Sequence, residues 1–239
     1  MEIVLYTVVG IALAWGAVLW FLRKIWFYRD PVRQPPEDPD LILAPCDGKV
    51  VYIRRIEQGK VECEKLGRPI EISEITHTDW DKGAQEGQGW LIGIYMSPLD
   101  VHYNYAPIAG AVEKIHKVDA RVNLPMVDLW EYVNLTYFRR AMDLLGKRYQ
   151  LENERQTIFL QGEKVKLAMV EIADKYVNKI TTYIQEGQVL HPAQKVSFIE
   201  RGSQVDLAVF STEVEILCKV GDQTAGGVTP LLRALDKTT

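Results

Sequence analysis

Three residues of this chain, Asp47, His102 and Ser203, have side chains that could together activate a hydroxyl nucleophile. A histidine takes the proton from a serine hydroxyl, and an aspartate holds the imidazole in the tautomer that can do so. The three residues lie in short motifs, PCDG at 45–48, SPLDVH at 97–102 and RGSQVD at 201–206. Each motif also has a plainer interpretation, as a turn, a surface histidine or a hairpin corner. The order Asp–His–Ser is therefore weak evidence when it stands alone.

Composition argues against several other kinds of site. The three cysteines are scattered singly without a CxxC pair, and the four histidines show neither HxxxH nor HExxH spacing. This pattern disfavours both a disulfide framework and a metal site. The formal net charge of −4 at pH 7 argues against a protein whose main partner is nucleic acid. Apolar residues make up 47% of the chain, so most of it should fold around a packed core.

A hydrophobic segment precedes all three motifs. Residues 3–22 contain no charge and no proline, and a helix of this length matches the apolar thickness of a bilayer. A cleaved signal peptide is the alternative, but the segment has no basic residues before it and no small-residue cleavage site after it. We therefore expect a single transmembrane helix within residues 1–24. Arg23, Lys24 and Arg29 follow it, so the positive-inside rule predicts a cytoplasmic domain at a prokaryotic plasma membrane.

The rest of the chain should position the candidate residues on a β-rich domain. Residues 25–40 contain four prolines between 30 and 40 and predict an extended connector. Residues 41–239 consist largely of short Val- and Ile-rich runs separated by glycines, which is typical of strands and turns. We expect a mostly β (α+β) domain with a lipoyl-like barrel-sandwich core. One amphipathic helix over 127–149 and a weaker one near 172–180 should interrupt it.

The expected helix over 127–149 has two interpretations. A stripe of apolar residues at helical spacing is most often buried in the core or in a dimer interface. Alternatively, the helix lies at a membrane surface, with Trp130, Tyr137 and Phe138 near lipid. Its cations would then face the headgroups; they are Arg139, Arg140, Lys147 and Arg148.

Longer segments make the three motifs much more specific. In order they are FYRDPVRQPP at 27–36, LAPCDGKVVYI at 43–53, MSPLDVHYNYAPIAGAVEKI at 96–115, ENER at 152–155, VKLAMVEIA at 165–173 and FIERGSQVDLAVF at 198–210. Together with the hydrophobic segment, they resemble the phosphatidylserine decarboxylase family in its short, membrane-anchored form. The resemblance covers nearly all of residues 41–239.

The resemblance implies a proenzyme that cuts itself between Gly202 and Ser203. The Ser203 hydroxyl would attack the Gly202 carbonyl, and later elimination and hydrolysis would leave a pyruvoyl group derived from Ser203. His102 would be the base, and Asp47 would orient it. The products would be a β chain of residues 1–202 and an α chain of residues 203–239.

The resemblance also implies a reaction and a substrate. The pyruvoyl group would condense with the serine amine of phosphatidylserine in an anionic membrane, and carbon dioxide and phosphatidylethanolamine would be released. His102 would return a proton to the α-carbon. Larger family members carry a second histidine where this chain has Tyr105, which leaves the proton transfers to His102 alone. Whether the protein forms a homodimer is left open by the sequence.

Two other functions remain open at this point. One is a decarboxylase that acts on a related amino-acid headgroup. The other is a non-catalytic, membrane-anchored adaptor, because glycine-punctuated strands also suit the barrel-sandwich modules of carrier proteins.

Overall fold

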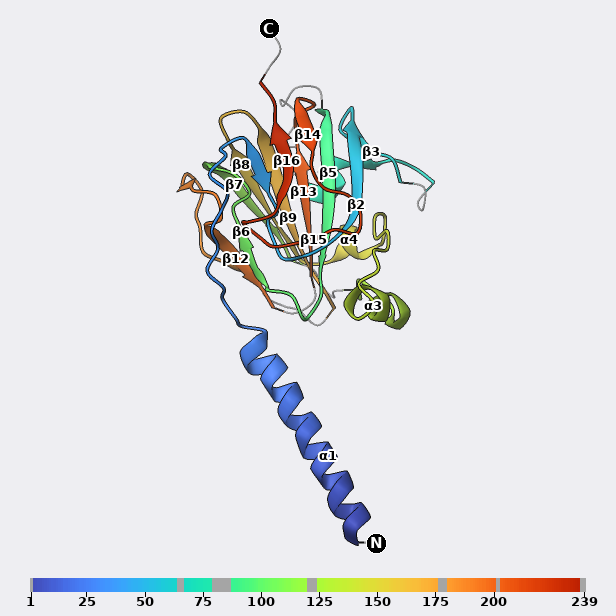
Figure 1. Ribbon diagram of the computed structural model, residues 1–239. Helices are drawn as coiled ribbons and strands as arrows, with labels where there is room; N and C mark the ends of the chain where they lie inside the picture. Colours follow the sequence, from blue (N-terminus) through green and yellow to red (C-terminus); the bar gives the residue numbers. More distant parts are fainter. Residues whose placement is uncertain are drawn as a thin grey trace.

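A long apolar helix extends from a β-rich domain. The computed structural model describes residues 2–63, 67–78, 87–119, 124–175, 180–200 and 203–236. Helix α1 (Glu2–Phe21) continues into a π-helical turn, η1 (Leu22–Trp26), and projects away from the domain (Figure 1). The 24 residues of Ile3–Trp26 are long and apolar enough to cross a membrane, and the domain buries none of their most apolar stretch. The expected N-terminal apolar helix is confirmed.

Antiparallel strands form most of the domain, as expected. In the described part of the chain, the largest sheet runs in the order β11-β7-β8-β9-β13-β5-β2-β3-β4, and β15 pairs with β2. Its strands are β2 (Gly48–Glu57), β3 (Lys60–Val61), β4 (Ile70–Glu71), β5 (Gly89–Met96), β7 (Gly110–Val118), β8 (Arg155–Gln161), β9 (Lys166–Ala173), β11 (Val189–Leu190), β13 (Ser203–Val209) and β15 (Gln223–Thr224). The sheet curls around the centre of the domain (Figure 1).

Two three-stranded sheets complete the β structure that is described. The first has the order β1-β16-β14 and the second the order β10-β12-β6. Their strands are β1 (Leu41–Leu43), β6 (Tyr103–Tyr105), β10 (Ile180–Thr182), β12 (Lys195–Ile199), β14 (Val214–Ile216) and β16 (Pro230–Ala234). The mostly β fold with few helices is therefore confirmed.

Both faces of the large sheet are covered, which explains the unusually apolar strands. On β13, Val205 and Leu207 point into a core that includes Ile42, Val196 and Leu232 of the two small sheets. On the other face, Ala208 belongs to a second core that includes residues of α2 (Ile72–Thr76) and of the segment 124–151. Successive side chains of a strand point to opposite faces, so a strand with two covered faces buries all of them. All seven residues of β13 are buried.

The expected helix over 127–149 is much shorter. The structure has α3 (Leu129–Thr136) and the short α4 (Tyr149–Glu152), with irregular chain between them. Asp128 caps α3 in a capping box with Glu131, but Arg139 adopts a left-handed backbone conformation with a φ of 52°. A helix cannot continue through that conformation. The apolar spacing that predicted one long helix therefore comes partly from irregular chain packed on the sheet.

The prediction of a weaker helix near 172–180 is wrong at both ends of that range. Ile172 belongs to β9 and Ile180 begins β10. Residues 176–179 lie outside the described residues.

A buried polar network lies on the face of β13 that Gln204 and Asp206 share. Tyr52 donates a hydrogen bond to Asp206 Oδ1 at 2.6 Å, and its hydroxyl accepts from the amides of Gln204 and Gln150, both at 2.8 Å. Burial raises the pKa of Asp206 to about 6, although hydrogen bonds donated to its carboxylate by Tyr52, Gln204 and Gln150 oppose the shift. The network links β2 and α4 to β13, the strand that carries Ser203.

Replacing Tyr52 tests the weight of this network. Tyr52→Phe should lower the free energy of unfolding by about 1–3 kcal/mol, because buried polar groups lose a partner that water cannot replace. Urea unfolding followed by circular dichroism in detergent measures the change. Tyr183→Phe is the control: its side chain is half exposed, and its variant should stay within about 0.5 kcal/mol of the parent. Equal stability of the two variants would contradict the prediction.

Candidate active site

Ser203 begins β13 in the middle of the large sheet. Pairing places it opposite Met96 of β5 on one side and opposite Ala173 of β9 on the other. Its side chain is fully buried, and its Oγ donates to the sulfur of Met96 at 3.1 Å. Gly202 and Arg201 lie outside the described residues. A serine hydroxyl is thus held on a central strand, with a neighbouring strand on each side.

His102 follows a tight turn at the end of β5 and is also fully buried. Its Nε2 lies 3.1 Å from the carbonyl oxygen of Ser97, which can only accept a hydrogen bond. The proton of the neutral imidazole therefore resides on Nε2, and Nδ1 carries a free lone pair. Nδ1 has no hydrogen-bond partner among the described residues. A buried acceptor without a partner is unusual and marks a candidate functional atom.

The sheet brings Ser203 and His102 to the same end of the domain. Met96, opposite Ser203, is followed directly by Ser97, whose carbonyl holds the imidazole of His102. On the other side, the backbone carbonyl of His102 accepts from the amide of Ile199 at 3.1 Å. Ile199 ends β12 and Ser203 begins β13, so Ile199 is hydrogen-bonded to His102 and Ser203 is paired with Met96 on the two sides of the predicted cleavage site.

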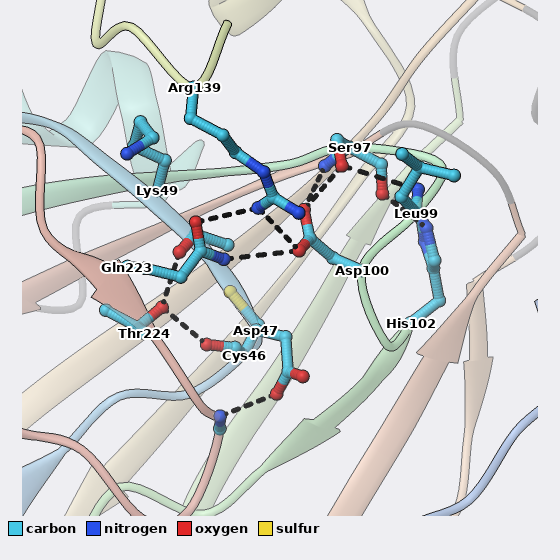
Figure 2. A network of polar contacts seen from close by, with 12 residues as sticks. Cys46, Asp47, Lys49, Ser97, Leu99, Asp100, His102, Arg139, Gln223 and Thr224 are labelled. Atoms are coloured by element: carbon cyan, nitrogen blue, oxygen red, sulfur yellow. Dashed lines mark hydrogen bonds and ion pairs between the residues drawn. The ribbon is translucent and has the colours of Figure 1, made fainter. Parts of the chain in front are cut away.

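Asp100 is the carboxylate that shapes the turn from Ser97 to His102 (Figure 2). Its Oδ2 accepts from both the amide of Ser97, at 2.9 Å, and the hydroxyl of Ser97, at 2.6 Å. Its Oδ1 accepts from Gln223 at 3.2 Å and pairs with Arg139 at 3.4 Å. From the sequence, Arg139 is expected only to face lipid headgroups, and Ser97 and Asp100 have no expected role beyond their place in the SPLDVH motif. The SPLD spacing could have indicated a role for the latter two, since serine and aspartate side chains commonly close such turns.

Asp47 is expected to orient His102, but its carboxylate binds other groups. Its Oδ1 forms an ion pair with Arg33 at 2.6 Å and accepts from the amide of Gly226 at 2.8 Å. The hydroxyl of Tyr105 accepts from the same arginine at 3.4 Å. The tautomer of His102 is instead set by the carbonyl of Ser97, a backbone partner that sequence motifs do not reveal.

Aromatic residues just after η1 cover His102. The ring of Phe27 lies against the imidazole with centroids 4.4 Å apart, and the ring of Phe198 packs edge-on against Phe27. Trp26 Nε1 and the guanidinium of Arg29 both donate to the carbonyl of Leu99, at 3.1 and 2.7 Å. The first part of the expected connector over 25–40 is therefore docked on the domain.

This cover determines the charge of His102. Burial lowers the pKa of His102 to about 4, while the hydrogen bond to Ser97 and the charge of Asp100 act in the opposite direction. The imidazole is neutral at pH 7 and can accept a proton at Nδ1. A neutral histidine with a free ring nitrogen, at the end of the sheet that carries a serine hydroxyl, has the groups that general base catalysis uses.

The residues present fit a cofactor formed from Ser203. In the part of the chain that the structure describes, no group of three or more His, Cys, Asp or Glu side chains could hold a metal ion. A group formed covalently from Ser203 needs only a nearby proton acceptor and shielding from water. The unpartnered Nδ1 of His102 and the ring of Phe27 fit those two needs.

Comparisons with known proteins find relatives that cover most of the chain. A model of the family described as phosphatidylserine decarboxylase matches residues 20–231. A protein of Magnetococcus marinus named phosphatidylserine decarboxylase proenzyme is 32% identical over 96% of this chain and 88% of its own length. A protein of Methanothermobacter thermautotrophicus, named provisionally as an archaetidylserine decarboxylase proenzyme, is 31% identical over 87% of this chain and 78% of its own length.

The contact between Phe27 and His102 can be tested by titration. Phe27→Ala should admit water to the imidazole and raise the pKa of His102 from about 4 towards its ordinary value of about 6.5. Nitrogen-15 NMR of labelled histidines in detergent micelles measures the pKa, and His102→Gln assigns the signal. Phe27→Leu, which keeps an apolar side chain there, is the control. A pKa still near 4 in Phe27→Ala would show that other residues keep the imidazole dry.

Proposed function

Because the chain belongs to the phosphatidylserine decarboxylase family, we propose that it is a self-processing enzyme that decarboxylates phosphatidylserine to phosphatidylethanolamine at a membrane. One observation of the structure supports this more than any other. The hydroxyl of Ser203 and the unpartnered Nδ1 of His102 lie at the same end of the sheet, joined through Met96 and Ser97.

The first proposed step is self-cleavage at Gly202–Ser203. The Oγ of Ser203 attacks the Gly202 carbonyl, while Nδ1 of His102 takes the hydroxyl proton; the amide bond breaks and an ester forms. Loss of the Cα proton then breaks the ester Cβ–O bond, which releases the upstream chain as a carboxylate and leaves dehydroalanine. Tautomerisation and hydrolysis yield a pyruvoyl group and ammonia. Two described residues on either side of this bond are held in place: Ile199 by its hydrogen bond to the carbonyl of His102, and Ser203 by its pairing with Met96.

In the second proposed reaction, the pyruvoyl group at position 203 supplies a carbonyl that binds the substrate amine and accepts electrons as carbon dioxide leaves. The chain's own residues do the rest. His102 takes up a proton at Nδ1 and returns it to the substrate carbon. Phe27 and Phe198 keep water away from that transfer.

We propose that Asp47 is a positioning residue rather than a direct partner of His102. Its ion pair with Arg33 and the link from Arg33 to Tyr105 fix the end of β6. That strand begins directly after His102, at Tyr103. Asp47 thus acts on the site through two other side chains.

Location follows from the helix and the charges around it. We propose that residues 1–24 form the membrane anchor and residues 25–40 the connector, and that residues 41–239 form a decarboxylase domain on the cytoplasmic side of the plasma membrane. Arg23 and Lys24 lie in η1, directly after α1, where they suit an anionic membrane surface.

A second substrate is supported by the comparison with the archaeal relative. Its identity of 31% is close to the 32% of the bacterial relative, and the names of the two relatives differ in the lipid and share the serine. Turnover of ester-linked and ether-linked serine lipids by the same preparation would decide between them.

Ser203→Ala tests the whole proposal. The variant lacks the nucleophile, so it should remain one uncut, inactive chain, whereas the parent should separate on denaturing gels into residues 1–202 and a small fragment beginning at 203. The mass of that fragment should correspond to a pyruvoyl group at its first residue. Ser211→Ala, a nearby serine whose hydroxyl only accepts from the Glu213 amide at the surface, should cut normally. An active Ser203→Ala enzyme, or a fragment that begins with serine, would contradict the mechanism.

His102→Gln tests the proposed base. Glutamine can still donate a hydrogen bond to the carbonyl of Ser97 but offers no basic nitrogen, so self-cleavage should slow by about 10²–10⁴-fold. Gel densitometry over time gives the rate. His191→Gln is the matched control, since His191 is exposed and lies outside the three motifs that contain Asp47, His102 and Ser203. Unchanged cleavage in His102→Gln would assign the base to another group.

A further inference from the structure

Helix α3 and the residues after it expose large apolar side chains. The exposed fractions are 80% for Leu129, 66% for Trp130, 66% for Tyr137 and 60% for Phe138. We call these four residues the α3 surface. The helix buries Asn134, Leu135 and Thr136 instead, two of which are polar. A helix of a domain surrounded by water normally buries its aromatic residues and exposes its polar ones, so this pattern indicates an apolar partner.

The α3 surface is held by ordered structure. The capping box of Asp128 and Glu131 starts the helix, and Lys147 forms an ion pair with Glu131. Arg139, three residues after the end of α3, has a left-handed backbone conformation, and its side chain forms an ion pair with Asp100. A non-glycine residue in that conformation costs free energy, so the surrounding contacts must hold it in place.

Its position relates the α3 surface to the membrane anchor. Helix α3 lies at the end of the domain from which α1 extends (Figure 1). Hydrogen bonds give the same relation: Arg139 contacts the side chain of Asp100, while Arg29 and Trp26 contact the backbone of Asp100 and Leu99. The chain that leaves the membrane helix and the chain that leaves α3 thus hold the same turn.

The cations near the α3 surface are less available to lipid headgroups than the sequence suggested. Three of the four cations expected to face headgroups are paired within the protein, namely Arg139 with Asp100, Lys147 with Glu131 and Arg148 with Glu152. The guanidinium of Arg140 lies 5.7 Å from the ring centre of Phe138. The α3 surface is therefore mainly leucine and aromatic, the composition typical of segments at the membrane–water interface.

We propose that the α3 surface is a second membrane contact, inserted into the interfacial region of the same leaflet from which α1 emerges. The bilayer is the occupant because the anchor brings it to this end of the domain. The turn that carries His102 would then lie between two membrane contacts and face the lipids. The proposal rests on the membrane location of α1 and is independent of the reaction.

Depth-dependent quenching in vesicles tests the contact. The full chain, carrying Ser203→Ala and Cys218→Ser, receives one new cysteine, Leu129→Cys, labelled with an environment-sensitive fluorophore; Cys46 and Cys63 are buried. The chain is reconstituted into vesicles of zwitterionic and anionic phospholipid with some lipids nitroxide-labelled near the headgroup. Because this chain cannot cut itself, the result does not depend on the proposed function.

Leu235→Cys is the matched control. Leu235 is an exposed leucine that follows β16, towards the C-terminus marked at the end of the domain opposite α1 (Figure 1). The label at 129 should emit at shorter wavelength and be quenched by the nitroxide lipids, and the label at 235 should not. Equal quenching at the two positions, or none at 129, would overturn the proposal. Shielding at 129 that grows with the ratio of protein to lipid would assign the surface to a second copy of the chain and would also overturn it.

A second variant links the contact to activity. In the chain with Ser203 intact, Trp130→Ser/Phe138→Ser should cleave itself at the parental rate. Turnover of lipid in vesicles should fall, and turnover of lipid dispersed in detergent should not. Loss in both media would show that the α3 surface belongs to the folded core rather than to a membrane contact. Failure of the parent to decarboxylate would instead contradict the proposed function and leave the quenching result standing.

Discussion

The hydrogen bond from Nε2 of His102 to the carbonyl of Ser97 determines what this end of the sheet can do. The imidazole is fully buried and therefore neutral, and a carbonyl accepts but never donates. A neutral imidazole that donates to this carbonyl carries its proton on Nε2, which leaves Nδ1 as the acceptor. Asp100 holds the turn that presents this carbonyl, and the pairing of β13 with β5 brings Ser203 beside the same turn.

Burying polar groups in this way has a cost that the rest of the domain must offset. Nδ1 of His102 and Oδ1 of Asn104 have no partner among the described residues, and burial raises the pKa of the neighbouring Glu171 to about 7. Hydrogen bonds from Ser197 and Asn104 to Glu171 recover part of that cost. Two apolar cores, one on each face of the large sheet, supply the remaining stabilisation. Unfavourable features of this kind concentrate where function requires them.

The residues that directly follow the apolar helix are part of the site. Phe27 follows the span directly, and its ring covers the imidazole of His102, while Trp26 and Arg29 bind the turn before it. With α1 in the membrane, as proposed above, a lipid substrate would reach a site at the end of this helix without leaving its leaflet. The same contacts couple the orientation of the domain to the orientation of the helix.

The sequence by itself determined the apolar helix, the mostly β domain and the three motifs that contain Asp47, His102 and Ser203. These features depend on local composition and periodicity, which a chain displays without folding. Only the tertiary structure decided that α3 ends at Thr136, that Asp47 binds Arg33, and that a backbone carbonyl sets the tautomer of His102. Each of those outcomes depends on contacts between residues far apart in the chain or on backbone atoms common to every residue. No pattern of side-chain types along the chain specifies which of them will meet.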